Sequence, residues 1–285
     1  FSGHCLIGEN GGLLGETEAI GDDFLLVRDC DLGRIRFDRR KNTTFQQNAA
    51  LHAAPMRFVS GSRQGRSDGG LYPVAKLPFV PSAQQDRHSR CMEIFGMQVA
   101  GLCRRLELLN CKAVIGVSGG LDSTLALLVT VRAFDLLNLP REQIHCITMP
   151  CFGTTDRTYT NACVMAKKVG ASLKEINIRK SVTSHFEDIG QDVNCHDVTY
   201  ENGQARERTQ ILMDISNQVG GLVIGTGDMS ELALGWATYN GDHMSMYGVN
   251  ASVPKTLVRH LVRYYADTCG EKELSDVLLD VLDTP

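Results

Sequence analysis

The sequence predicts an α/β protein in which a parallel, doubly wound β-sheet covered by helices follows a β-rich segment. From residue 113 onward, short apolar runs alternate with helical stretches, a pattern typical of parallel strands joined by right-handed crossovers. Residues 60–82 are instead rich in serine, glycine and proline, which predicts loop and linker structure. We therefore expect a first domain over residues 1–60, a linker over 61–85 and the α/β domain over 86–285.

Size and composition exclude several classes of protein. The chain has 285 residues, 43% of them hydrophobic, which excludes a disordered chain or a small disulfide scaffold. Its net charge of -4 gives no basic face for nucleic acid. The longest apolar stretch, around Leu125–Val131, is far shorter than the roughly 20 residues that span a bilayer, and the first residues lack the charged and apolar regions of a signal peptide. Ten scattered cysteines without CxxC pairs fit reduced thiols, so we expect a cytoplasmic protein without membrane contact.

The two ends of the sequence indicate a piece of a longer protein. The chain starts at Phe1 without a methionine and stops at Pro285 directly after an amphipathic run. We therefore expect a fragment whose α/β domain is truncated at its carboxyl end.

Residues 1–40 are expected to form β structure. His4–Ile7 and Leu13–Glu16 flank Asn10-Gly11-Gly12, whose backbone can take the positive φ angles of a tight hairpin. A third strand is expected at Phe24–Val27.

The α/β domain is expected to open with a helix at Asp86–Leu109. Its apolar residues recur at spacings of three and four and so share one helical face: Phe95, Val99, Leu102, Leu106 and Leu109. The strands that follow are expected at Ala113–Val117, Ile144–Met149, Leu173–Ile178 and Leu222–Ile224. Helices are expected after Asp122, from Asp156 and after each later strand. Ligands should bind at the carboxyl ends of these strands.

A glycine loop follows the first of these strands. Val114–Thr124 runs from a buried-strand pattern through Ser118-Gly119-Gly120 into a helix, and the free N–H groups at a helix start favour an anion such as phosphate. The loop lacks the spacing and the lysine of a Walker A motif. Asp122 in such a site makes sense if a divalent cation lies between it and the phosphates. A plain strand-to-helix turn capped by an aspartate is the alternative interpretation.

Here the sequence resembles a known family. Ser118–Ser123 is similar to the SGGxDS loop of the ATP pyrophosphatases, which cleave ATP between its α and β phosphates. Two later segments, Glu201–Arg208 and Gly225–Trp236, resemble the ENxQARxR and GTGDxSELALGW segments of the NAD synthetases. The resemblance is nearly continuous from Arg90 to Asp280 and is specific to the glutamine-dependent form.

The amino-terminal residues carry a second resemblance. Gly3–Gly11 and Asp31–Asp38 are similar to the closing strands of the nitrilase-type glutaminase domain that precedes the synthetase in this family. The Glu, Lys and Cys of that domain's site would lie upstream of Phe1, so no glutaminase residue is assigned. The intact enzyme would take ammonia from glutamine, whereas this chain would need free ammonium.

The resemblance implies an adenine nucleotide alpha-hydrolase, or Rossmann-like, fold and a set of site residues. The residues at catalytic positions of the family are Asp122, Arg206 and Lys255. The residues at ATP-binding positions are Gly116, Ser118, Gly119, Gly120, Asp122, Ser123, Met149, Thr226 and Lys255. The residues at positions for nicotinic acid adenine dinucleotide (deamido-NAD) are Glu231, Trp236 and Asp242. Asp122 and Glu231 would hold Mg²⁺, with ATP as co-substrate.

The implied activity is the ATP-dependent amidation of deamido-NAD to NAD through an acyl adenylate, releasing AMP and pyrophosphate, by a homo-oligomer. Another ATP pyrophosphatase, such as a tRNA-thiolating enzyme or GMP synthetase, is an alternative; the net charge and the absence of CxxC weigh against the first of these. A folded but inactive scaffold is a second alternative. Cys195-His196 has no companion metal ligands nearby, and Cys151 stands where a small residue such as glycine is expected.

Overall fold

The computed structural model describes residues 4–17, 25–52, 57–60, 76–81, 83–153 and 156–284. The chain divides into two compact units, Phe1–Lys76 and Leu77–Pro285.

The first unit contains the predicted hairpin. Strands β1 (Leu6–Glu9) and β2 (Gly12–Glu16) pair antiparallel. Asn10 and Gly11 link them with φ angles of 49° and 82°, so both lie in the left-handed region that a two-residue hairpin turn requires. The hairpin prediction is confirmed.

The rest of this unit differs from the strands that we expected. Phe24 lies outside the described residues, and residues 25–27 form no strand. Most of Asp31–Asp38 belongs to helix α1 (Leu32–Lys41), which α2 (Thr43–Leu51) follows. The resemblance of Asp31–Asp38 to the closing strands of a nitrilase-type domain implied a strand, but the residues at both ends of this segment favour a helix. Asp31 caps the first turn by accepting a hydrogen bond from the Arg34 N–H, and three basic residues in the last turn suit the helix dipole.

The second unit opens with helix α3 (Gln84–Leu109), which confirms the predicted helix within two residues. Phe95, Val99, Leu102 and Leu106 are buried as expected. Leu109 is 53% exposed instead, because it lies in the last turn, next to the left-handed cap at Asn110. The apolar face of α3 thus ends one turn before the helix does.

A five-stranded parallel sheet forms the centre of this unit. Its strands are β3 (Lys112–Gly116), β4 (Ile144–Thr148), β5 (Ser172–Glu175), β6 (Gly221–Gly225) and β7 (Tyr247–Gly248). The spatial order is β5-β4-β3-β6-β7. The chain therefore builds outward from β3 to β5 and then returns to the other side of β3, which places a topological switch point between β3 and β6. The short β7 was not predicted, and β5 ends three residues earlier than expected.

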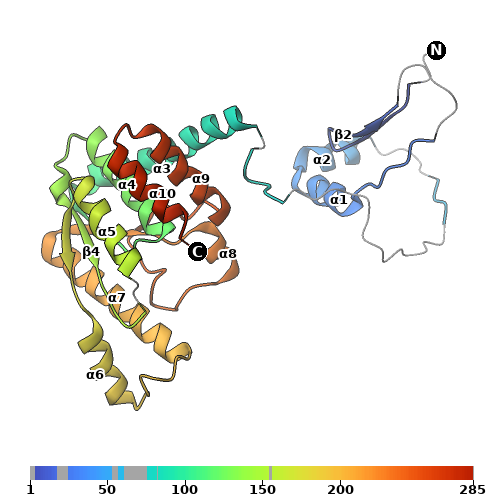
Figure 1. Cartoon of the computed structure of the whole chain (residues 1–285). Coiled ribbons are helices and arrows are strands. Elements are labelled where there is room, and N and C mark those ends of the chain that lie inside the picture. Colours follow the sequence, from blue (N-terminus) through green and yellow to red (C-terminus); the bar gives the residue numbers. More distant parts are fainter. Residues whose placement is uncertain are drawn as a thin grey trace. The chain divides into compact units, whose positions relative to one another are not determined.

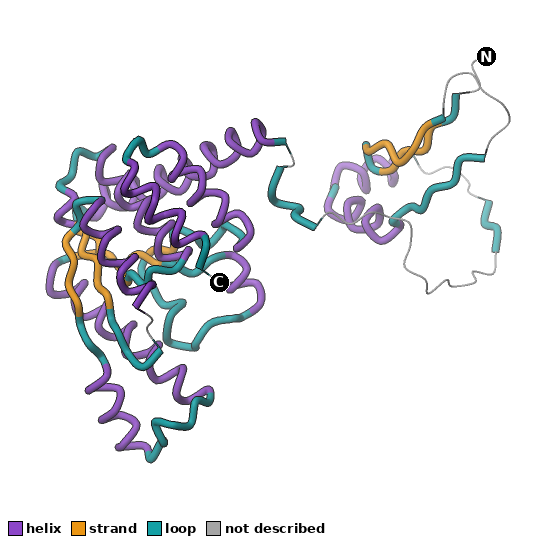
Figure 2. The backbone as a smooth tube through the Cα atoms, in the orientation of Figure 1, coloured by secondary structure: helices purple, strands orange, loops and turns teal. Residues whose placement is uncertain are grey.

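Helices cover both faces of the sheet, which confirms the doubly wound prediction (Figures 1 and 2). On one face, α4 (Leu121–Leu136) and α5 (Asp156–Lys168) pack against the strands. Helices α3 and α9 (Lys255–Thr268) pack on α4, and α10 (Lys272–Leu282) packs on α5 and α9, within the same hydrophobic cluster. The other face packs against α6 (Arg179–Ile189) and α7 (Val198–Val219). Neighbouring residues of β3 point to opposite faces, Ile115 into the first cluster and Val114 into the second. The remaining elements are the short α8 (Met229–Leu234) and a 3₁₀ turn at Arg141–Gln143.

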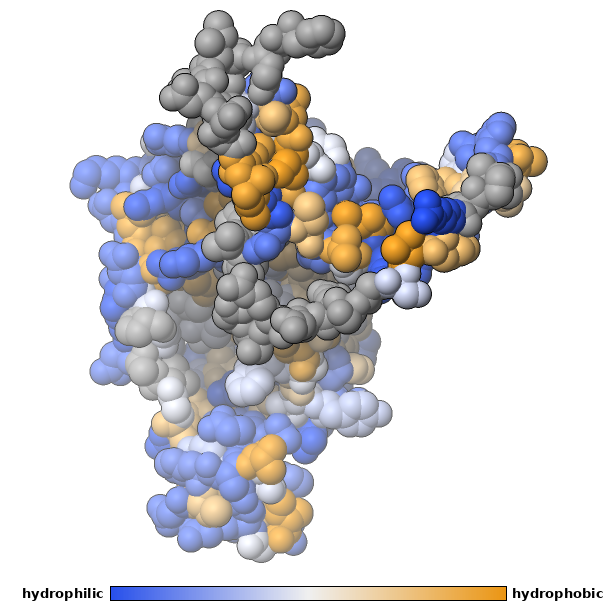
Figure 3. All heavy atoms as spheres, turned by 90° about the vertical axis from the view of Figure 1, so that its right-hand side faces the viewer, coloured by the Kyte–Doolittle hydropathy of each residue, from blue (hydrophilic) through white to orange (hydrophobic). Residues whose placement is uncertain are grey.

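The end of α6 and the start of α7 project from the unit (Figure 1), and Figure 3 shows this end as mainly hydrophilic with single apolar side chains. In the part of the chain that the structure describes, no helix combines the length and the apolar character needed to cross a membrane.

Candidate active site

The glycine loop lies where β3 ends and α4 begins. Gly119 has a φ of 80°, and a Cβ atom at this position would overlap the carbonyl oxygen of Thr158 in the first turn of α5. Only glycine fits between the loop and α5 here. Among the described residues no side chain caps the start of α4 at Gly120, so its first N–H groups remain available for an anion.

A second loop connects β6 to α8 and carries two carboxylates. Asp228 and Glu231 form a capping box: Asp228 Oδ1 accepts hydrogen bonds from the N–H groups of Ser230 (2.6 Å) and Glu231 (3.0 Å), and Glu231 Oε2 accepts one from the Asp228 N–H (3.1 Å). The Asp228 side chain is fully buried. The box fixes one oxygen of each carboxylate and leaves the other oxygen for a cation.

Lys255 joins the two loops at the start of α9. Its Nζ atom lies 2.7 Å from Asp122 Oδ2, 2.7 Å from Asp228 Oδ2 and 3.0 Å from Glu231 Oε1. The structure therefore brings together Asp122, Glu231 and Lys255 from the predicted set. It adds Asp228, which the sequence interpretation missed, although an acidic residue three positions before Glu231 is itself a capping-box signal.

The three carboxylates also form a group that could hold a divalent cation. One oxygen from each of Asp122, Asp228 and Glu231 lies within 4.8 Å of the others, and an all-oxygen ligand set suits Mg²⁺. Asp122 Oδ1 is buried and has no hydrogen-bond partner among the described residues, so a ligand position stands open there. The residues present thus fit the ion that the resemblance implies.

The pKa values of Asp122 and Lys255 are both raised. Burial is the largest cause of the upward shift in the Asp122 pKa, and the charges of Glu231 and Asp228 add to it, while the Lys255 ammonium acts in the opposite direction. Burial alone would lower the pKa of Lys255, but its hydrogen bonds to three carboxylates outweigh burial, and the net shift is upward. Lys255 is therefore a firmly charged partner of the three acids.

A buried amide sets the spacing of the two loops. Asn250 has no exposed surface, and its Nδ2 donates to the carbonyl oxygens of Asp122 (2.9 Å) and Thr226 (3.0 Å). Gln98 of α3 donates from its Nε2 to Asn250 Oδ1 (3.1 Å) and to the Val249 carbonyl (2.8 Å). The Asn250 side chain thus ties Asp122, in the first turn of α4, to Thr226, which directly follows β6.

We expect Asn250→Ala to destabilise the protein by about 2–3 kcal/mol, because the Asp122 and Thr226 carbonyl oxygens each lose a hydrogen bond from a fully buried amide. The Gln98 Nε2 also loses one of its two acceptors. Chemical denaturation measures this loss. Asn217, exposed on α7, is the matched control: Asn217→Ala should change the free energy of unfolding by less than about 0.5 kcal/mol. An Asn250→Ala variant as stable as the control would show that the Asn250 hydrogen bonds do not hold the two loops together.

Two adjoining cavities open at the carboxyl ends of β3 and β6. The first, of about 340 Å³, is lined by Asp122 and Glu231 among others, and the second, of about 360 Å³, by Gly116 and Met149. Both cavities share residues of the two loops and of the segment after α8: Ser118, Ser123, Gly225, Thr226 and Asp242. An elongated ligand could thus place one end in each cavity and pass over the glycine loop.

Two predicted residues lie elsewhere. Arg206 is exposed, lines neither cavity and donates from Nε to the Tyr239 carbonyl (3.1 Å). Trp236 is 78% exposed and lines neither cavity. Arg208 lines the second cavity instead. It lies two positions after Arg206 on the same α-helix, and side chains at this spacing point about 200° apart. The roles assigned to Arg206 and Trp236 stay predictions.

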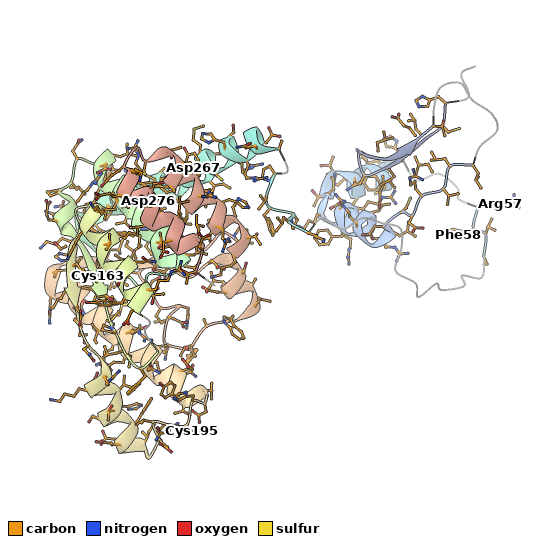
Figure 4. The ribbon with its side chains drawn as sticks, viewed as in Figure 1. Arg57, Phe58, Cys163, Cys195, Asp267 and Asp276 are labelled. Atoms are coloured by element: carbon orange, nitrogen blue, oxygen red, sulfur yellow. The ribbon has the colours of Figure 1, made fainter. Side chains whose placement is uncertain are left out.

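Cys195 and Cys151 are not part of the carboxylate group around Lys255. Figure 4 places Cys195 in the loop between α6 and α7, and the neighbouring His196 stacks on Tyr200 at 4.4 Å. Among the described residues, the one group able to hold a metal is that of Asp122, Asp228 and Glu231. Cys151 is buried in the core beneath α6 and α7, and burial raises the pKa of its thiol.

A glycine loop at the switch point of a parallel sheet, beside an acidic group that could hold a cation, is typical of α/β nucleotide-binding proteins. A family model described as NAD synthase matches residues 102–272. The chain belongs to the NAD synthase family, which confirms the resemblance seen in the sequence.

Individual relatives agree with this assignment. The protein of Mycobacterium leprae named glutamine-dependent NAD(+) synthetase is 43% identical over 297 residues, covering 100% of this chain and 44% of that protein. The chain thus spans less than half the length of this curated relative.

Solved structures support the fold. The glutamine-dependent NAD+ synthetase from Acinetobacter baumannii, in complex with adenosine diphosphate, has a TM-score of 0.59 and 27% identity, covering 69% of this chain and 36% of that one. The NMN synthetase from Francisella tularensis has a TM-score of 0.58 and 22% identity, covering 68% and 74%. At that identity the second likeness shows the fold alone.

Proposed function

We propose that this chain carries the synthetase activity that converts deamido-NAD to NAD with ATP and ammonia. The observation that carries the proposal is the placement of the glycine loop around the same cavity as Asp122 and Glu231, two of the three carboxylates that could hold a cation, at the switch point. Membership of the NAD synthase family supports the same reaction. The relative from Mycobacterium leprae is named for this activity in its glutamine-dependent form.

The two cavities suggest how the substrates are divided. The adenosine end of ATP would occupy the second cavity, beside Met149 and Leu212, and its phosphates would reach the glycine loop and Thr226. Deamido-NAD would present its nicotinate carboxylate in the first cavity, near Asp242, which lines both. The α-phosphorus of ATP would then lie at the junction of the cavities.

The reaction proceeds in two steps. The nicotinate carboxylate oxygen attacks the α-phosphorus of ATP, the bond to the β-phosphate oxygen breaks, and pyrophosphate leaves. Ammonia then attacks the activated carbonyl carbon and loses a proton to solvent, and AMP departs with the bonding pair of the carbon–oxygen bond. The free N–H groups at the start of α4 would hold the departing pyrophosphate, and Lys255 would neutralise part of its charge.

Asp122, Asp228 and Glu231 would hold Mg²⁺, which would add charge neutralisation on the phosphate oxygens. With these groups in place the reaction needs no covalent nucleophile from the protein, since orienting the carboxylate and stabilising charge account for the rate. The whole enzyme would draw ammonia from glutamine, whereas this chain would use free ammonium. A homo-oligomeric state and a cytoplasmic location are part of the same proposal.

The products of a defined mixture test the proposed function. With Mg-ATP, deamido-NAD and an ammonium salt, we expect NAD, AMP and pyrophosphate in equal amounts, measured by liquid chromatography. A mixture without ammonium should yield no NAD, and nicotinic acid mononucleotide in place of deamido-NAD should be amidated far more slowly. Formation of ADP in place of AMP would contradict attack at the α-phosphorus, and preference for the mononucleotide would reassign the substrate.

A further inference from the structure

Lys255 forms ion pairs with the carboxylate oxygens that a divalent cation would need as ligands. Its ammonium lies within 3.0 Å of one oxygen each on Asp122, Asp228 and Glu231. These oxygens belong to the same three residues that could together bind a cation. The lysine and the metal ion therefore converge on one place.

The second oxygen of each carboxylate is a poor alternative ligand for a cation, except that of Asp122. Asp228 Oδ1 already accepts two backbone hydrogen bonds, and Glu231 Oε2 accepts one. Asp122 Oδ1 alone of the three has no hydrogen-bond partner among the described residues. A cation that needs several protein oxygens must take those that Lys255 holds.

The two cations exclude each other at this position. Mg²⁺ binds oxygen at about 2.0–2.1 Å, so an ion held by these oxygens would need the space that the ammonium occupies. Two positive charges would then stand in direct contact with each other. With Lys255 present, the three acids also keep a net charge of only two units, which weakens their attraction for a second cation.

The lysine is able to move away. Its backbone is fixed at the start of α9, where its N–H donates to Ser230 Oγ (3.0 Å), but its side chain is 43% exposed and has a flexible four-carbon stem. Phosphate groups bound at the glycine loop would offer the ammonium other charged partners. The lysine would then leave its carboxylates to the metal.

We propose that Lys255 closes the cation site in the nucleotide-free protein, so that a divalent cation binds only after the phosphates of a nucleotide draw the lysine away. The identity of that nucleotide rests on the proposed function. The competition itself rests on the contacts of Lys255 and requires no turnover.

Binding of Mn²⁺ to the nucleotide-free chain tests this inference, with free Mn²⁺ measured by electron paramagnetic resonance. We expect Lys255→Met to bind one Mn²⁺ at least about 10-fold more tightly than the wild-type chain, which corresponds to about 1.4 kcal/mol. Lys174→Met, which removes an equal charge from an exposed position on β5, should bind Mn²⁺ as the wild type does. Adding Asp122→Asn to Lys255→Met should abolish the gain.

Equal affinity of the wild type and Lys255→Met for Mn²⁺, or binding by neither, overturns the inference. If Lys255→Met does not fold, the wild type alone decides: Mg²⁺ without nucleotide should leave its melting temperature unchanged, and Mg-ATP should raise it. A rise with Mg²⁺ alone as large as with Mg-ATP overturns the inference. If Lys255→Met bound Mn²⁺ more tightly but the wild type formed no NAD, the proposed function would be rejected. The competition of Lys255 with a divalent cation for the three carboxylates would still be supported.

Discussion

Asp122→Asn is expected to lower kcat about 10²- to 10³-fold while changing the affinity for deamido-NAD little. The substitution keeps the size of the side chain but removes the charge of the carboxylate that faces both the glycine loop and Lys255. We expect Asp122 to act through the Mg²⁺ that it would help to hold, because that ion would neutralise charge as pyrophosphate departs and would affect binding of the dinucleotide less. Steady-state kinetics with ammonium, combined with titration of deamido-NAD, separates the two quantities.

The control for this variant is a carboxylate remote from the cavity. Asp188 is exposed near the end of α6, and Asp188→Asn should retain wild-type kinetics. Equal losses of turnover and of dinucleotide affinity in Asp122→Asn would show that Asp122 serves binding and would argue against a metal role.

The α/β unit was predictable because its signals are local and repeated. A run such as Ala113–Val117 is apolar throughout, as a strand buried on both faces must be, and a glycine turn marks its end. The positions of the two loops follow from this pattern, since parallel strands all end at the same edge. The short β7 escaped prediction because Tyr247 and Gly248 carry no strand pattern and pair only through β6.

The residues missed at the site depend on contacts between distant segments. Asp228 is recognised as a partner of Lys255 only when the end of β6 meets the start of α9. Asn250 spans 128 residues of sequence to reach the Asp122 carbonyl. Helix α1 was missed for a different reason. Its capping signal at Asp31 is local, but the strand expectation for Asp31–Asp38 came from a family resemblance and not from the residues themselves. Periodicity locates elements, whereas side-chain geometry selects the members of a site.

Gly119→Ala is expected to destabilise the protein by about 3 kcal/mol and to remove ATP binding, because the change affects both the conformation and the space of the loop. A residue other than glycine at a φ of 80° carries a backbone cost of about 1–3 kcal/mol. The added methyl group would also overlap the Thr158 carbonyl, which belongs to the backbone of α5 and cannot turn aside as a side chain would. Either the loop or α5 must move, and the N–H groups that face the cavity move with the loop.

Chemical denaturation and ATP titration measure the two effects, and the neighbouring glycine provides the control. Gly120 has a φ of -86°, and a Cβ there would meet only Ser118 Oγ at 3.4 Å, an ordinary contact. Gly120→Ala should therefore cost less than about 1 kcal/mol of stability. If Gly119→Ala unfolded at the same denaturant concentration as Gly120→Ala and still bound ATP, the glycine loop would not be held against α5, and the phosphate site built on it would have to be placed elsewhere.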